Sequence, residues 1–251
     1  MGSVRAVRTT QTAPPRKRAS APAKVIGPSA LAPLPPDITE LRADVGVESF
    51  DYFEIVEPRE AWPDQFRQAA GELAAVRADC TLRLDHIGST AIPGLAAKDR
   101  LDIQLTTHDL AQARALIEPL VSLGYKHEPQ LSTDRWPIEP SERVKLFLHR
   151  SERQPHVNLH VREVGRGNWL YALLFRDYLR VMPAQAAAYA EMKTRLAELA
   201  DGQRGPYSYV KEPACDLIFN AASEWAVAVG WKASDYEVPN LDEFASAAIS
   251  T

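Results

Sequence analysis

The stretch "HIGSTAIPGLAAKDRLDIQL", residues 86–105, decides how this chain folds. Small and turn-forming residues lie between two apolar runs, and the second run contains an aspartate, Asp102. Gly88 and Ser89 end the first run, because a glycine beside a serine is typical of a turn. A carboxylate inside an apolar strand needs an ionic partner or a ligand. The stretch therefore predicts a strand, a turn and a second strand that carries a functional group.

The hydrophobic pattern on either side predicts a mixed α/β region followed by helices. Strands are expected where β-branched and alternating apolar residues gather, at 47–58, 81–89, 100–107, 143–150 and 156–164. Helices are expected where apolar residues recur at helical spacing, at 60–80, 108–125, 168–182, 184–200 and 210–231. Pro93 is placed to start a single helical turn, and the short segment 151–155 predicts a hairpin. The fold class is α+β, with a mixed sheet, flanking helices and a C-terminal helical part.

Composition divides the chain further. Residues 1–36 contain six basic residues, no acid and seven of the nineteen prolines, so they cannot bury enough apolar surface to become ordered. The remaining residues comprise 23 basic against 33 acidic side chains, a net charge of −10. We expect a disordered basic tail at 1–40, an α/β domain at 41–166, a helical part packed on it at 167–233, and a flexible tail at 234–251.

Several classes of protein lack their signature here. No apolar run approaches the roughly 18 residues of a membrane helix, and no signal peptide is recognisable, so a cytoplasmic protein without membrane contact is expected. Cys80 and Cys215 form neither a disulfide framework nor a paired metal motif. The motifs of serine hydrolases, P-loop kinases, zincins and dinucleotide-binding proteins are absent. The few charges of the basic tail do not predict specific nucleic-acid binding.

The Gly-Ser turn and the aspartate suit phosphate and metal chemistry. Gly88 lets a ligand approach the backbone, while Ser89 and Thr90 offer hydrogen-bond donors to an anion. Asp102 would hold a divalent cation, Mg²⁺ or Mn²⁺, against the phosphates, and Lys98 lies close enough in sequence to contact them. The alternative is a purely structural loop, since Gly-Ser turns also precede strands without any ligand.

The same stretch resembles the first signature of the GrpB family. The later string "HVNLHV…NWLYALLFRDYLR…YAEMKTRLA…YSYVKEP" resembles the second signature, so the resemblance covers roughly residues 51–230. The family also occurs as the C-terminal accessory domain of dephospho-CoA kinase. The resemblance implies a nucleotidyltransferase-like fold, in which Gly-Ser and then Asp-x-Asp or Asp-x-Glu on the next strand bind nucleotide and metal.

The sequence departs from this pattern at the second acid, where Gln104 stands. On the later strand, His156, Asn158 and His160 would share one face, because side chains alternate along a strand. Two interpretations stay open for the histidines: they line the cleft beside Asp102, where they could bind zinc or manganese or contact a phosphate, or they make structural hydrogen bonds. The same two interpretations apply to His86, which lies just before the turn.

The helical part offers further cations. Arg176 and Arg180 lie one helical turn apart and could clamp a phosphate, or they could pair with nearby acids on a solvated face. Lys211 is a stronger candidate than Lys193 for the cleft, because it is expected at a junction between a loop and a helix.

Two functions follow from the resemblance. In the first, the protein is a nucleotidyltransferase that uses Ser89 and Asp102, with a metal ion, to transfer a nucleotidyl group to an unknown acceptor. In the second, Gln104 marks the loss of catalysis, and the protein is a nucleotide-binding, ligand-binding or folding-accessory domain. In both, the partner is a nucleotide or another phosphorylated small molecule.

Overall fold

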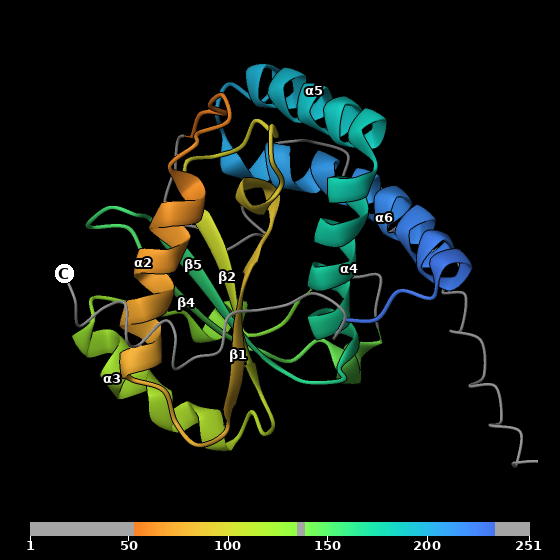
Figure 1. The fold of residues 1–251 in the computed structure, drawn as a ribbon. Helices are drawn as coiled ribbons and strands as arrows, with labels where there is room; N and C mark the ends of the chain where they lie inside the picture. Colours follow the sequence, from red (N-terminus) through yellow and green to blue (C-terminus); the bar gives the residue numbers. More distant parts are fainter. Residues whose placement is uncertain (1–52, 135–138, 234–251) are drawn as a thin grey trace, which may run out of the picture.

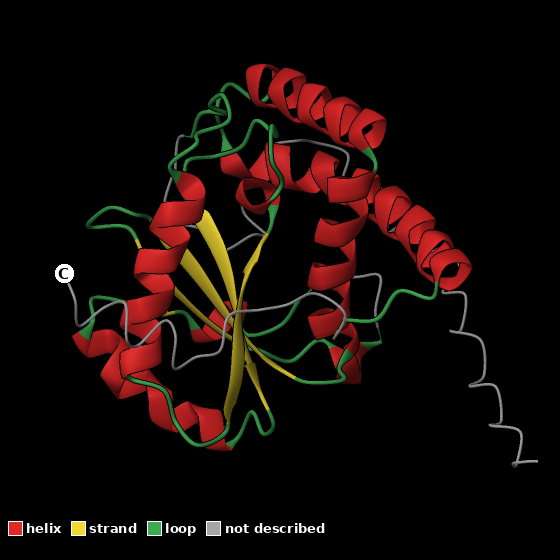
Figure 2. Ribbon diagram, viewed as in Figure 1, coloured by secondary structure: helices red, strands yellow, loops and turns green. Residues whose placement is uncertain are grey.

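The computed structural model describes residues 53–134 and 139–233. A five-stranded mixed sheet with helices on both faces forms the centre of this part of the chain (Figure 1; Figure 2). The strands are β1 (Thr81–Ile87), β2 (Leu101–Thr107), β3 (Lys126–His127), β4 (Leu146–Arg150) and β5 (Val157–Glu163). Their order across the sheet is β1-β2-β5-β4-β3. Only β2 and β5 run parallel, and the other neighbouring strands are antiparallel. The fold is therefore the predicted α+β fold with a mixed sheet.

One face of the sheet carries the main hydrophobic core. Because side chains alternate along each strand, Ile103 on β2 and Leu159 on β5 point to this face, and both are fully buried. The helices that cover it are α2 (Trp62–Ala75) and α3 (Ile117–Ser122), the latter continuing the 3₁₀ turn η2 (Gln112–Leu116). Figure 1 shows α2 and α3 on the same side of the sheet.

The opposite face of the sheet is polar, and the C-terminal helices lie over it. These are α4 (Gly167–Val181), α5 (Pro183–Leu199) and α6 (Arg204–Val229), which pack together in a second apolar cluster with Ile92 and Leu95. α4 runs along the sheet, and α5 and α6 cross beyond the ends of the strands (Figure 1). The functional groups predicted on β2 and β5 therefore lie between a polar sheet face and a helical cover.

Most predicted elements are present, with four corrections. The part of 47–58 that is described contains only an isolated bridge between Val56 and Ala97, and no strand. The short 3₁₀ turn η1 covers Ser89–Ala91 and ends before Pro93, which instead lies in a turn. The predicted helix 108–125 is shorter and begins as a 3₁₀ turn. α6 begins at Arg204, so Lys211 lies inside a helix and not at its junction with a loop.

The predicted hairpin is confirmed, since β4 and β5 pair antiparallel. Within the described ranges, no helix has the length and apolar character needed to span a membrane. The tails predicted at 1–40 and 234–251 lie outside the described residues.

Candidate functional site

The Gly-Ser turn brings the backbone into close contact with Asp102. Gly88 has φ +69° and ψ −167°, a conformation that is disfavoured for any residue with a Cβ atom. A Cβ atom placed on Gly88 would lie 2.4 Å from Asp102 Oδ2, closer than any real contact. The glycine is therefore required both for the shape of the turn and for the space that the Asp102 carboxylate occupies.

Asp102 lies on the polar face of β2 beside two residues of β5. Asn158, its register partner, donates a hydrogen bond from Nδ2 to Asp102 Oδ1 at 2.9 Å, and His160 Nε2 lies 3.6 Å from the same oxygen. Burial would raise the pKa of Asp102, but these two donors and the charge of Lys211 lower it to about 2. The carboxylate is therefore ionised at neutral pH, with about a third of its side chain exposed.

Gln104, two residues further on β2, is completely buried and turned toward the helical cover. Its Oε1 accepts a hydrogen bond from Arg162 Nη1 at 2.7 Å, and its Nε2 donates to the backbone oxygen of Trp169 at 3.3 Å. Arg162 in turn binds the Asp134 carboxylate with Nε at 2.9 Å and Nη2 at 3.2 Å. Gln104 thus belongs to a buried network and does not line the cleft.

Asp134 is a further carboxylate near Asp102, and its charge is compensated. Lys145 forms an ion pair with it, and Asn168 donates a hydrogen bond to it at 3.0 Å. Although burial opposes ionisation, the neighbouring Arg162 and Lys145 hold the pKa of Asp134 far below its ordinary value.

His160 connects the two carboxylates. Its Nδ1 lies 3.3 Å from Lys145 Nζ and 3.2 Å from Arg162 Nη2, both of which can only donate. Burial and these two cations lower the pKa of His160 to about 4. The ring is therefore neutral at pH 7, with Nδ1 as acceptor and its hydrogen on Nε2, which faces Asp102.

Cations face Asp102 from the other side as well. Lys98 Nζ lies 3.4 Å from the centre of the Phe53 ring and 4.4 Å from that of Tyr207. Burial and the charges of Arg204 and Lys211 lower the pKa of Lys98 to about 7. Burial also opposes the charge of Lys211, but its neighbours, which include Tyr207, raise the pKa of Lys211 above its ordinary value.

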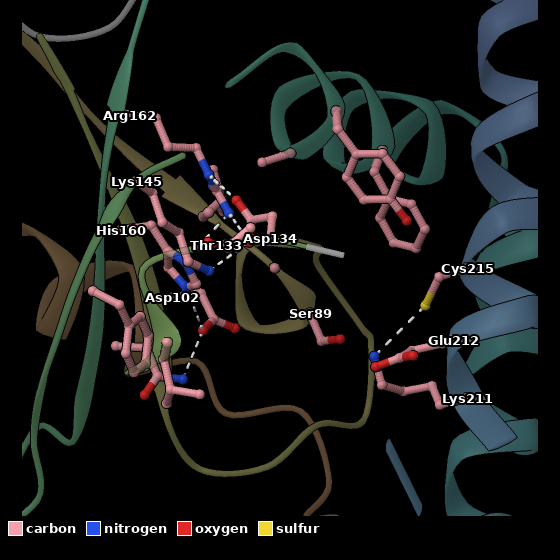
Figure 3. A pocket seen from close by; sticks show the side chains of 18 of the residues that line it. Ser89, Asp102, Thr133, Asp134, Lys145, His160, Arg162, Lys211, Glu212 and Cys215 are labelled. Atoms are coloured by element: carbon pink, nitrogen blue, oxygen red, sulfur yellow. Dashed lines mark hydrogen bonds and ion pairs between the residues drawn. The ribbon is translucent and has the colours of Figure 1, made fainter. Parts of the chain in front are cut away.

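These groups line two adjoining cavities of about 450 and 670 Å³ between the sheet and α6. Figure 3 shows Asp102, His160 and Lys145 on the sheet side, with Lys211 and Cys215 projecting from α6 across the space. The two cavities share the residues at their centre, which are Ser89, Asp102, Asn158, Tyr189, Arg204 and Lys211. Together they form one cleft, which we call the Asp102 cleft.

Most of the predicted site residues line the Asp102 cleft. They are Gly88, Ser89, Thr90, Lys98, Asp102, His156, His160 and Lys211. The two histidines do not converge, however: His160 lies next to Asp102, whereas the ring of His156 contacts Gln154 at 3.4 Å near the mouth.

His86 and Arg176 lie away from the cleft. His86 faces the α2 side of the sheet, where its ring stacks on Phe66 at 4.9 Å and its Nε2 contacts Thr90 Oγ1 at 2.9 Å. Arg176 is buried against Asp85 and Asp177 and donates to the backbone oxygen of His86 at 3.0 Å. Arg176 thus anchors α4 to β1 and is not placed to clamp a phosphate in the cleft.

Four residues of the cleft were missed by the sequence analysis. Arg162 continues the alternation of His156, Asn158 and His160, so the strand pattern contains the signal for it. Arg204 was hidden because its segment was taken for a loop. Lys145 lies in the predicted strand 143–150, where alternation puts it on the same face as Phe147. Asp134 lies outside the strands, where alternation gives no signal, and is placed by tertiary packing alone.

The side chains near Asp102 do not provide the ligands that a metal ion held by the protein alone would need. No three His, Cys, Asp or Glu side chains gather to hold an ion in residues 53–134 and 139–233. A divalent ion at Asp102 would find one protein carboxylate, with Gln104 turned away and Asp134 engaged by Arg162 and Lys145. The cleft is also lined by the cations Lys98, Lys145, Arg162, Arg204 and Lys211, and by the acids Glu212 and Asp216 of α6.

A mixed sheet with a Gly-Ser turn, an aspartate on the next strand and a helical cover defines an α+β protein with a nucleotidyltransferase-like fold. The model of the GrpB protein family matches residues 53–221, and the chain belongs to this family. The crystal structure of GrpB from Enterococcus faecalis superposes with a TM-score of 0.60 at 24% identity, covering 68% of this chain and 97% of that one.

The curated relatives include dephospho-CoA kinases and UPF0157 proteins. A dephospho-CoA kinase of Mycolicibacterium paratuberculosis is 34% identical over 194 residues, covering 71% of this chain and 48% of that protein. A UPF0157 protein of Halalkalibacterium halodurans is 33% identical over 167 residues, covering 64% of this chain and 78% of that protein. The chain therefore spans about half the length of the dephospho-CoA kinases that it matches.

Proposed function

We propose that the Asp102 cleft binds a nucleotide or a related phosphorylated small molecule. The observation that carries this proposal is the convergence of Lys98, Arg204 and Lys211 on the Gly-Ser turn. Burial and then repulsion from Arg204 and Lys211 lower the pKa of Lys98, and an anion between these cations would stabilise their charged forms. The Ser89 hydroxyl and the Thr90 backbone supply further donors at the turn.

The similarity to dephospho-CoA kinases supports a ligand of this class. The matching part of those relatives accompanies an enzyme whose name specifies a phosphorylated nucleotide derivative. We therefore propose ATP, dephospho-CoA and inorganic triphosphate as the first ligands to be tested.

Isothermal titration calorimetry with Lys211→Met and a matched control tests the proposal. Hydrogen bonds to charged groups contribute about 1.5–3 kcal/mol, so loss of the ammonium should weaken binding roughly tenfold or more. Lys126→Met is the control, because Lys126 lies on β3 with 72% of its side chain exposed and does not line the cleft. Equal affinities for the two variants, or no binding of any of these ligands by the wild type, would reject the cleft as a phosphate site.

Nucleotidyl transfer is a second candidate, favoured by the contact between Gly88 and the ionised Asp102. It requires release of pyrophosphate from a nucleoside triphosphate when an acceptor is added. Loss of this release in Asp102→Asn, with folding preserved, would support transfer over simple binding.

A further inference from the structure

The first clue concerns the position of the second acid. In a site that holds two ions on Asp-x-Asp or Asp-x-Glu, the second carboxylate faces the same space as the first. Here Gln104 is fully buried, and both ends of its amide are engaged, by Arg162 and by the Trp169 backbone. A guanidinium therefore binds at the place where a second ion would need an acid.

The second clue concerns Asp134, a carboxylate that lines the cleft on the sheet side. Asp134 receives two hydrogen bonds from Arg162, an ion pair from Lys145 and one hydrogen bond from Asn168. These contacts engage both of its oxygens. Moving Asp134 to a metal ion would take the carboxylate away from two buried cations, Arg162 and Lys145, which is strongly unfavourable.

The third clue is the set of cations around Asp102 itself. Lys145 lies on the sheet side with His160, and Lys211 projects from α6 on the opposite side (Figure 3). Lys98 lines the same space from the loop before β2. All three ammonium groups interact electrostatically with the Asp102 carboxylate. These ammonium groups attract the Asp102 carboxylate, but they would repel a divalent cation placed beside it.

We infer that the Asp102 cleft binds its phosphorylated ligand without a divalent cation. Lys98, Lys211 and Arg204 neutralise the phosphates directly, and the Arg162–Lys145–Asp134 network takes the place of a second metal site. This inference rests on the proposed function, since it concerns the same ligand in the same cleft. It also gives Asp102 a new role, as the counter-charge that keeps the lysines together while the cleft is empty.

Calorimetric titration with inorganic triphosphate tests the inference on the wild-type protein, once in EDTA and once in excess Mg²⁺. Binding in EDTA should be as tight as in Mg²⁺ or tighter, because Mg²⁺ reduces the ligand charge that the protein cations recognise. Binding that appears only with Mg²⁺, or that Mg²⁺ strengthens about tenfold or more, overturns the inference and leaves the proposed function standing. No binding under either condition overturns both.

Asp102→Asn gives a second, opposite-signed test. A metal ligand loses affinity when its carboxylate is neutralised, whereas a counter-charge beside an anion site should gain it. In EDTA we expect the variant to bind triphosphate more tightly by roughly threefold or more, since one repulsive charge is removed. Weaker binding by a variant that melts like the wild type overturns the inference. Glu60→Gln, an exposed acid that does not line the Asp102 cleft, should leave the affinity unchanged.

Discussion

Gly88 determines both the conformation of the turn and the position of the charged Asp102 carboxylate. Its positive φ already disfavours a side chain, and the space where its Cβ would lie is filled by the Asp102 carboxylate. Gly94 offers a matched comparison, because its φ is +74° and an added Cβ would meet nothing within 4 Å.

We therefore predict that Gly88→Ala destabilises the protein well beyond Gly94→Ala. The control carries only the strain of a left-handed residue, about 1–3 kcal/mol, whereas Gly88→Ala must also displace Asp102. Urea denaturation of both variants measures the difference. Triphosphate affinity should change in Gly88→Ala and stay at the wild-type value in Gly94→Ala. Equal free energies of unfolding for the two variants would argue that Asp102 moves aside easily.

Single residues also show what alternation can and cannot predict. Alternation predicts that His156, Asn158 and His160 share one face of their strand, and the structure has Asn158 and His160 beside Asp102. The same rule would have put His86 with Leu84 on the α2 side, where the structure has it. Gln104 points to the same face of β2 as Asp102, but α4 covers it through Trp169, a contact between distant segments that no local pattern contains.

At the scale of elements, α4 is held to β1 by buried charges. Arg176 pairs with Asp85 and Asp177, and Trp231 Nε1 donates to Asp177 at 3.2 Å. The sequence predicted α4 closely because its apolar residues recur at helical spacing. It did not predict this attachment, because an arginine on a helix surface looks the same whether it meets solvent or a buried acid.

Replacing Arg176 with leucine should destabilise the fold by roughly 3–5 kcal/mol, because the buried Asp177 loses its ionic partner at 2.7 Å and Asp85 is left with Arg83. Arg180→Gln is the control: Arg180 is one turn further along α4, a third of its side chain is exposed, its Nε donates to the backbone oxygen of Ala91 at 2.9 Å, and its contact with Asp177 measures 3.9 Å. A change below about 1 kcal/mol is expected there. Chemical denaturation gives both values. Well below its melting temperature, Arg176→Leu should still bind triphosphate, and a selective loss of binding would instead favour the phosphate clamp.

The lengths of the C-terminal helices were less predictable than their existence. The start of α6 was placed six residues too late, because Gly205 and Pro206 in "DGQRGPYSY" are typical of a loop. Proline is tolerated in the first turn of a helix, where its missing N–H has no partner to lose. This early start brings Arg204 onto the same helix as Lys211 over the cleft, so the error in the boundary concealed Arg204.

At the scale of the whole molecule, the buried lysines should make stability rise with pH. Burial, together with neighbouring cations, lowers the pKa of Lys98 and Lys193 from an ordinary 10.5 to about 7, and that of Lys145 to about 8. Between these values and 10.5 the unfolded chain binds more protons than the folded one, so the free energy of unfolding increases with pH. The destabilisation is complete below about pH 7 and is relieved progressively above it.

Urea denaturation at pH 7, 8 and 9 measures this rise. The measurements stop at pH 9 because the pKa of Lys211 is raised and that of Tyr207 is raised to about 12. Above pH 10 these two groups make the free energy of unfolding fall as the pH rises. Lys193→Met should be more stable than the wild type at pH 7, because it has no buried ammonium group at this position. Its free energy of unfolding should also increase less with pH, because methionine does not titrate. Saturating triphosphate should flatten the wild-type profile, because an anion in the cleft favours the charged lysines. If the free energy of unfolding of the wild type fell from pH 7 to pH 9, groups of the protein itself would already stabilise the charged lysines. The proposal that the cleft binds an anion would then lose this support.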